Sequence, residues 1–354
     1  MPNCSSPAIS PIFIENISFY TIMTNSVIMS ILTYYIILTK SSLLGRFKYY
    51  LLYQTVCAQL LEITIVAVKP VVLTPYLGGF TGGILRNILT YDTFLISVWL
   101  GYCTAGTCII SAALSVIYRF FFIFQPHNRK YLENKYNFVV IFTGHIAAYC
   151  IFAYFILIDK VGQSALIPVA LNNSGTALVE YFFEPGFAIF SEHEGIVRWL
   201  FKCIFYFILA ISTAFLGSIV FAIVSFFVSH RSKITITRTT RSLLMTSLSQ
   251  ATLCVIFLNG PSMLVIGTWG WNVPNSNFAA NIAMNLVSLY ATFDRISTLC
   301  FVAPYRKFII SKLNGVIPCR SHPKIRVMLS GQVSWHGQIG GMAKVKHKKK
   351  DTGR

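Results

Sequence analysis

The chain has 354 residues, and its 29 lysines and arginines against 11 acidic residues give it a net charge of +18. Only 11% of its residues are charged and 55% are apolar, whereas a soluble globular protein has about 25% charged residues. This composition excludes an ordinary water-soluble domain, a disordered chain, which needs low hydrophobicity, and a soluble nucleic-acid-binding domain, whose basic residues form a surface patch.

Seven apolar stretches of about 20 residues or more, enough to cross a bilayer core, follow one another along the chain. Backbone N–H and C=O groups find no partners in lipid, so each stretch is expected to be a helix, and the runs are too long and too evenly apolar for barrel strands. The predicted fold class is an all-α membrane protein, a seven-transmembrane helix bundle. Its expected spans are residues 17–39, 49–68, 93–117, 136–158, 199–228, 243–267 and 278–302.

Basic residues are divided unevenly between the two sides of this predicted bundle. The short connections on one side hold Lys40, Arg46, Lys48, Arg119, Arg129, Lys130, Lys135, Arg231, Lys233, Arg238 and Arg241. Those on the other side hold Lys69, Arg86, Lys160 and Arg198. Because basic loops stay in the cytosol, we expect residues 1–16 outside and the C-terminus in the cytosol. All three N-glycosylation sequons lie on the predicted outer side; they start at Asn3, Asn16 and Asn172.

The segment after the seventh stretch divides into two parts. Residues 303–317 place apolar side chains such as Phe308 among basic ones, which predicts an amphipathic juxtamembrane helix on the inner leaflet. Cys319 follows and is a candidate for palmitoylation. Residues 318–354 are rich in Gly, Lys, Ser and His and predict a disordered, basic cytosolic tail, which is either solvated or bound to anionic lipid.

No motif indicates catalysis or a bound cofactor. The chain has no G-x-S-x-G elbow, no Walker A loop and no H-E-x-x-H zinc motif. Its nine cysteines are scattered singly, without histidines at metal-ligand spacing. We therefore expect no enzyme activity, no cofactor and no metal site.

The region between the first and third stretches carries an ordered series of short motifs. It contains Lys40-Ser41-Ser42, the run from Phe47 to Gln54, and then Pro70, Leu73, Pro75-Tyr76, Gly79-Phe80 and Gly83. This series resembles the Sri and Srh classes of nematode serpentine chemoreceptors, in the Str superfamily. Two tyrosine–arginine pairs, Tyr118-Arg119 and Tyr305-Arg306, also resemble that family, and the resemblance extends over most of residues 12–315.

The resemblance implies a G-protein-coupled chemosensory receptor of the plasma membrane, placed in the sensory cilium of a chemosensory neuron. Such a receptor binds an external odorant or another small molecule and activates a heterotrimeric G protein. The sequence departs from rhodopsin-like receptors, because the outer loop from Asp159 to Arg198 has no cysteine for the usual disulfide. An acidic residue is also missing before Arg119, so we do not transfer the detailed activation mechanism of that class.

Charged residues inside the predicted spans are expensive unless they are paired or hydrated. Glu62, Asp294 and Arg295 are therefore predicted either to form an interior polar cluster that rearranges during activation or to form a static packing pair. Arg295 has the further alternative of snorkelling to the inner interface.

Four residues at the predicted cytosolic side are candidates to face the G protein: Tyr118, Arg119, Tyr305 and Arg306. The alternative for Arg119 is an ordinary positive-inside residue. Pro261 follows Asn259-Gly260 and is expected to kink the sixth helix. The kink is either a hinge or an example of the prolines that membrane helices tolerate.

Aromatic side chains near the outer halves of the third, fifth and sixth spans suit an apolar odorant pocket. The alternative for each is a place in the core or in an interfacial aromatic belt. The candidates are Tyr91, Phe94, Trp99, Tyr102, Tyr206 and Trp269. The alternative function for the whole chain is a ligand-gated channel or transporter subunit.

Overall fold

The computed structural model describes residues 9, 13, 17–41, 45, 47–124, 131, 134–158, 160–191, 196–231 and 238–316. The chain divides into two compact units, residues 1–310 and residues 311–354. The first unit contains the helix bundle.

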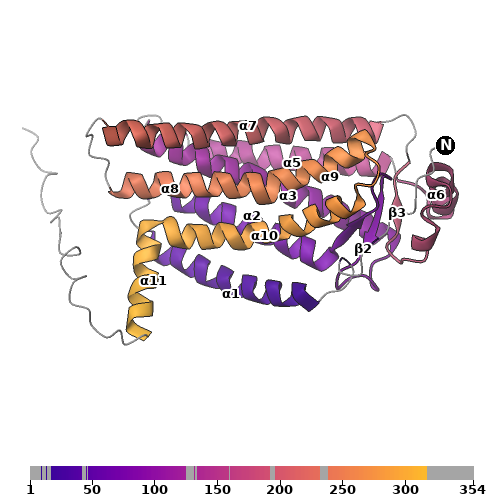
Figure 1. Cartoon of the computed structure of the whole chain (residues 1–354), viewed down its shortest axis with the longest axis horizontal. Coiled ribbons are helices and arrows are strands. Elements are labelled where there is room, and N and C mark those ends of the chain that lie inside the picture. Colours follow the sequence, from indigo (N-terminus) through magenta and orange to yellow (C-terminus); the bar gives the residue numbers. More distant parts are fainter. Residues whose placement is uncertain are drawn as a thin grey trace, which may run out of the picture. The chain divides into compact units, whose positions relative to one another are not determined.

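Seven long helical segments lie alongside one another in this bundle (Figure 1). Within the described residues, five of these segments are long and apolar enough to cross a membrane, and α10 counted with α11 as one bent span would be a sixth. The remaining segment, α1, has 24 residues, or about 36 Å at 1.5 Å per residue, a length comparable to the thickness of a bilayer core. The segments are α1 (Ile17–Lys40), α2 (Phe47–Val68), α3 (Tyr91–Phe124), α5 (Lys135–Ile158), α7 (Ile196–Arg231), α8 (Arg238–Leu253) continued by η6 (Cys254–Asn259) and α9 (Gly260–Trp271), and α10 (Asn277–Phe301).

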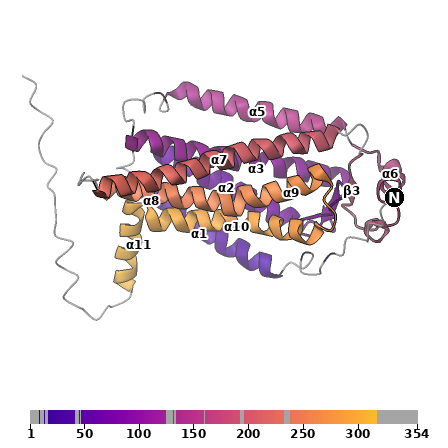
Figure 2. The ribbon, with the colours of Figure 1, turned by 45° about the horizontal axis from the view of Figure 1, so that its top comes forward.

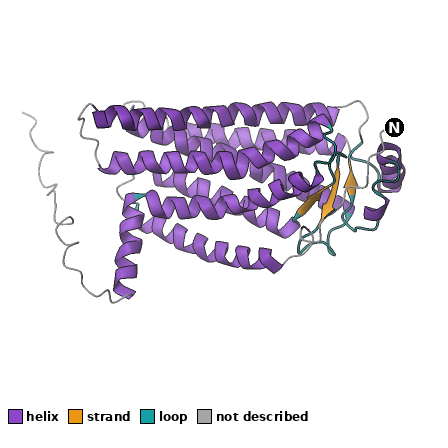
Figure 3. Ribbon diagram, in the orientation of Figure 1, coloured by secondary structure: helices purple, strands orange, loops and turns teal. Residues whose placement is uncertain are grey.

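A small antiparallel sheet closes one end of the bundle (Figure 3). Its strands follow the order β1 (Pro70–Val72), β2 (Gly78–Thr81) and β3 (Ala188–Ile189). The register pairs Val71 with Phe80 and Gly79 with Ala188. A Cβ atom on Gly79 would lie 2.6 Å from the carbonyl oxygen of Val71, so only glycine fits this close approach. The hydropathy pattern did not predict the sheet, because strands of two to four residues leave no periodic signal.

We call residues 69–90 and 160–191 the lid, and the end of the bundle that they cover the lid end. Besides the sheet, the lid contains η3 (Gln163–Ala165), α6 (Leu166–Ser174) and η4 (Val179–Tyr181). The rings of Phe80 and Tyr181 stack with centroids 5.6 Å apart. Many motif residues of the resemblance, from Pro70 to Gly83, therefore build this one hairpin.

Several polar contacts hold the lid together and onto the bundle. The guanidinium of Arg86 donates two hydrogen bonds to the carboxylate of Glu184, at 3.0 and 2.6 Å. These bonds raise the pKa of Arg86 above its ordinary value. In α10, the amide of Asn281 accepts from the backbone N–H of Val72 at 3.1 Å and donates to its carbonyl at 3.0 Å. Backbone pairing and these contacts thus join the two loops without a disulfide.

The opposite end of the bundle, the α11 end, is marked by a sharp turn. The α11 helix (Ala303–Val316) begins two residues after α10 ends, and the two helix axes differ by 86°. The side chain of Phe308 packs near Tyr35 of α1, with ring centroids 6.3 Å apart, and the ammonium of Lys40 lies 5.0 Å from the same ring. Apolar and cationic contacts therefore fix the start of α11.

Candidate functional site

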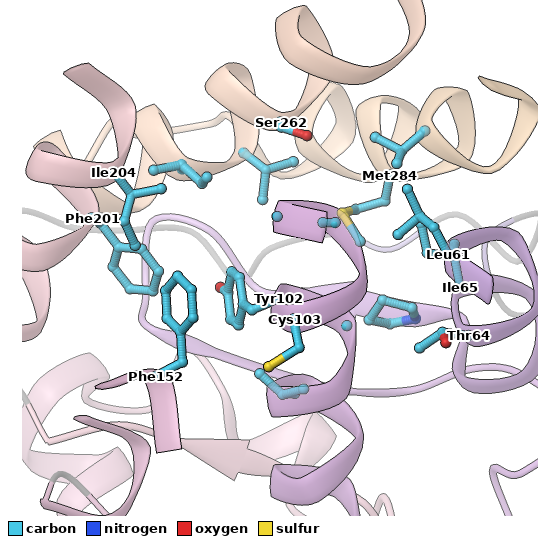
Figure 4. A pocket seen from close by; sticks show the side chains of 18 of the residues that line it. Leu61, Thr64, Ile65, Tyr102, Cys103, Phe152, Phe201, Ile204, Ser262 and Met284 are labelled. Carbon is cyan, nitrogen blue, oxygen red and sulfur yellow. The ribbon is translucent and has the colours of Figure 1, made fainter. Parts of the chain in front are cut away.

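A cavity of about 470 Å³ lies beneath the lid, between the helices. Side chains from α2, α3, α5, α7, α9 and α10 line it, and the glycines of β2 cover it. Figure 4 shows Leu61, Ile65 and Met284 on one side of this space and Tyr102, Phe152 and Phe201 on the other. Its volume falls in the range of small-molecule pockets.

The lining of this cavity is almost entirely apolar, and the described residues that form it include no Asp, Glu, Lys or Arg. Most of its polar groups are already bonded to the protein. The hydroxyls of Thr107 and Tyr149 bond to each other, and the ring of His145 lies 3.0 Å from the hydroxyl of Tyr53. The hydroxyl of Ser97 donates to the carbonyl of Thr93 at 2.9 Å. A neutral, largely apolar molecule therefore matches this space best, since a charge would find no partner.

The six aromatic residues predicted for a pocket divide into two groups. Phe94, Tyr102 and Trp269 line the cavity. The other three lie outside it. Tyr91 donates to the carbonyl of Val161 in the lid at 2.8 Å, Trp99 donates to the carbonyl of Tyr149 in α5 at 3.0 Å, and Tyr206 is 59% exposed on the lipid-facing side of α7.

Several lining residues were not among the sequence candidates, notably Phe152, Phe201 and Met284. No sequence signal distinguishes them, because the apolar pattern of a helix does not say which neighbouring helix or cavity each of its side chains meets.

The first buried charge centre joins α1, α2 and α10. The guanidinium of Arg295 forms an ion pair with the carboxylate of Glu62, and both side chains are 1% exposed. Arg295 also donates to the carbonyl and hydroxyl of Ser26, at 2.9 and 2.7 Å, and to Ser30 and Gln59. Since Arg295 is enclosed in the bundle, it does not snorkel to an interface.

The second buried centre contains Asp294 and Arg119. Asp294 accepts a hydrogen bond from the amide of Gln54 at 2.9 Å and is 1% exposed. Arg119 of α3 is fully buried, and none of its three guanidinium nitrogens has a hydrogen-bond partner among the described residues. Asp294 lies within electrostatic range of it. The α3 helix continues beyond the predicted boundary at residue 117 to Phe124, so Arg119 lies within it.

The neighbouring residues of the two tyrosine–arginine pairs have different environments. Tyr118 is buried and stacks on Phe47, with ring centroids 5.2 Å apart. The guanidinium carbon of Arg119 lies 5.3 Å from the same Phe47 ring. Tyr305 is buried and shares a hydrogen bond with the hydroxyl of Ser41, whereas Arg306 is exposed.

The sixth helical segment is interrupted where Pro261 was expected to kink it. Regular α-helix stops at Leu253, a π-helical turn covers Cys254–Asn259, and α9 begins at Gly260. Pro261 lacks an N–H group, and a π-turn is one way in which a helix absorbs such a missing bond. The ribbon changes direction between α8 and α9 (Figure 1).

Comparison with known families decides what this bundle is. A sequence model described as serpentine type 7TM GPCR chemoreceptor Srh matches residues 10–315. The chain belongs to the Srh family of serpentine chemoreceptors. A comparison with curated proteins finds no matching sequence. The Srh family is a receptor family rather than an enzyme family, and this Srh receptor is a multi-pass membrane protein.

One predicted modification site of this Srh receptor lies within the described residues, and the others do not. Asn172 lies on α6 and is exposed, so its side chain is open to modification. Asn3, Asn16 and Cys319 lie outside the residues that the structure describes.

Proposed function

We propose that this Srh receptor is a chemosensory, olfactory-type G-protein-coupled receptor that binds a neutral, lipophilic small molecule in the cavity beneath the lid. The observation that carries the proposal is a pocket of about 470 Å³ with an apolar, uncharged lining in a chain of the chemoreceptor family. An external odorant of this chemistry gains from leaving water and needs few hydrogen bonds.

The proposed orientation places the lid end outside the cell and the α11 end in the cytosol. The excess of basic residues in the connections at the α11 end supports it, because such residues are retained on the cytosolic side. Exposed Asn172 on the lid side agrees with a glycosylated outer face. The family supports a place in the plasma membrane, in the cilium of a chemosensory neuron.

In this proposal, a heterotrimeric G protein binds at the α11 end and responds to the occupied cavity. A ligand shifts the receptor toward the active arrangement only if it binds that arrangement more tightly. The π-turn before Pro261 separates α9, which lines the cavity, from α8, which reaches the α11 end. Movement of α8 about this turn would uncover Arg119, whose buried guanidinium has no hydrogen bonds to described residues that it would lose.

The test is a heterologous cell response to a panel of neutral lipophilic odorants, read through a G-protein reporter. Gly101 lines the cavity, and a Cβ atom added there meets nothing within 4 Å, so Gly101→Phe should fill the space and abolish the response. Gly217 has equally open surroundings but does not line the cavity. Gly217→Phe is therefore the matched control and should respond like the wild type.

The competing hypothesis is a ligand-gated channel or transporter subunit. Seven-helix chemoreceptor channels of other lineages have the N-terminus inside, so surface labelling of tags at both termini discriminates between the two. A cytosolic N-terminus, or an equally strong response in cells that lack the G protein, would reject our proposal in favour of the channel.

A further inference from the structure

The lid seals the cavity on the side that we assign to the outside. Its hairpin residues are almost inaccessible: Val71 and Leu77 are 1% exposed, and Phe80 is fully buried. On the other strand, Ala188 and Ile189 are 1% and 2% exposed. The Arg86–Glu184 pair and the β2–β3 pairing fasten the two halves of the lid. The described residues of the lid therefore obstruct the direct path from outside water into the cavity.

The side of the bundle between α5 and α7 is much more open. Only 6% of the apolar stretch of α5 is buried in the protein, compared with 67% for α2. In Figure 2, α5 is the outermost of the long helices, and it diverges from α7 with distance from the lid. The cavity extends to this side, because its lining includes Phe207, which is 59% exposed, and Cys203, which is also exposed.

The residues beside this opening also line the cavity inside the bundle. Tyr102 of α3 packs against Phe152 of α5, with ring centroids 6.1 Å apart, and against Phe201 of α7, at 6.2 Å. Gly106 lies one helical turn beyond Tyr102, on the same face of α3. It also lines the cavity, and a Cβ atom added there meets nothing within 4 Å.

We infer that the ligand enters the cavity from the bilayer, through a lateral opening between α5 and α7 bordered by Phe152, Cys203 and Phe207, and not through the lid. This inference rests on the proposed function. It adds the route by which the ligand enters the cavity and the solubility class to which the ligand belongs. A molecule that suits an apolar, uncharged cavity also concentrates in hydrocarbon. The bilayer then acts as the reservoir from which the receptor is filled.

The experiment measures binding rates of a lipophilic probe to the full-length receptor in lipid nanodiscs. The probe is N-phenyl-1-naphthylamine, which accepts excitation energy from tryptophan, and Trp269 lines the cavity. We take the part of the probe's fluorescence that disappears in Gly101→Phe as the measure of binding inside the cavity. Stopped-flow mixing gives association rates, and displacement by excess unlabelled odorant gives dissociation rates.

A side chain placed in the lateral opening should slow entry and exit together. We expect Gly106→Phe to lower both rates at least tenfold. Phe207→Ala should widen the opening and raise both rates severalfold. Gly217→Phe, on a lipid-facing part of α7, and Arg86→Ala, which loosens the lid, should leave both rates unchanged.

Unchanged rates in both Gly106→Phe and Phe207→Ala overturn the lateral route, and so does faster association in Arg86→Ala. If Gly106→Phe abolishes the equilibrium signal, Phe207→Ala decides by its rates alone. A wild-type signal no larger than that of Gly101→Phe rejects cavity binding, and with it both the route and the proposed function. Cavity binding with normal rates in the two opening variants rejects the route only.

Discussion

Two arginines are buried in this bundle to almost the same degree, and their surroundings are opposite. Arg295 is 1% exposed and Arg119 is fully buried. Every nitrogen of the Arg295 guanidinium donates a hydrogen bond, and Glu62 neutralises its charge. The Arg119 guanidinium donates none to any described residue, and its nearest opposite charge, on Asp294, is bonded to Gln54.

The difference is between an arginine whose charge and hydrogen-bond donors are all satisfied and one whose donors are not satisfied by any described residue. Removing charges from water is repaid only when pairing and hydrogen bonding are nearly complete. The Arg295 centre meets that condition and joins three helices. Arg119 does not meet it, so a conformation that exposes Arg119 to water or to a partner regains solvation energy. We therefore regard Arg295 as fixed in both receptor states and Arg119 as the residue that changes its environment.

The largest expected effect is the loss of the Arg295 pair. Arg295→Met leaves the carboxylate of Glu62 buried and unpaired, which should destabilise the folded receptor by about 3–5 kcal/mol. Surface expression and the apparent unfolding temperature in nanodiscs measure this loss. The double variant Glu62→Gln, Arg295→Met should recover most of it, because no unpaired charge remains. Equal losses in the single and double variants would contradict the pairing.

A smaller loss of stability is expected when Asp294 loses its hydrogen bond from Gln54. Gln54→Met removes the amide that donates to Asp294 at 2.9 Å and should cost about 0.5–1.5 kcal/mol, the usual net contribution of one hydrogen bond, since Gln250 still interacts with Asp294. The apparent unfolding temperature again provides the measurement. Gln54→Glu should be worse still, because it places a second carboxylate beside Asp294. A Gln54→Met variant as stable as the wild type would contradict this role of Gln54 and would mean that Gln250 alone satisfies Asp294.

The change that sharpens the comparison most is Arg119→Met. Because it removes a buried cation that has no hydrogen bonds to described residues, we expect stability within about 1 kcal/mol of the wild type, or higher. The apparent unfolding temperature, measured beside that of Arg295→Met, provides the test. Equal destabilisation by the two substitutions would mean that both arginines are structural.

The smallest effect is expected for a third arginine, at the surface. The Arg86–Glu184 pair is bidentate, but the side chain of Arg86 is 37% exposed, and water screens such pairs. Arg86→Ala should therefore cost only a few tenths of a kcal/mol to about 1 kcal/mol. Because the pair raises the pKa of Arg86, Arg86 stays charged at every physiological pH, and the effect should shrink with added salt. A loss as large as that of Arg295→Met would contradict this ranking.

The sequence predicted the helical spans because a bilayer imposes a length and composition that can be read directly. It also identified Glu62, Asp294 and Arg295 as unusual, and left open whether they form one cluster or a packing pair. Consecutive residues of a helix point about 100° apart, so Asp294 and Arg295 meet different neighbours and belong to different centres. The burial of Arg119 was not predicted, because it depends on how α3 packs against α2, where Phe47 lies beside the guanidinium.

The lid and the cavity lining could not be predicted from the sequence, for a different reason. Strands of two to four residues and helices that are apolar all round carry no periodic signal that tells inside from outside. The family motifs from Pro70 to Gly83 identified the relevant segment, and the structure explains them as one hairpin.

Our central claim is that occupancy of the cavity at the lid end is read out by Arg119 at the α11 end. The most direct test is the odorant-stimulated rate of nucleotide exchange on the G protein, per receptor at the cell surface, for Arg119→Met beside Gly217→Phe. We predict that Arg119→Met loses at least tenfold in this rate at normal surface abundance, while Gly217→Phe keeps the wild-type rate. A wild-type rate in Arg119→Met would contradict the claim.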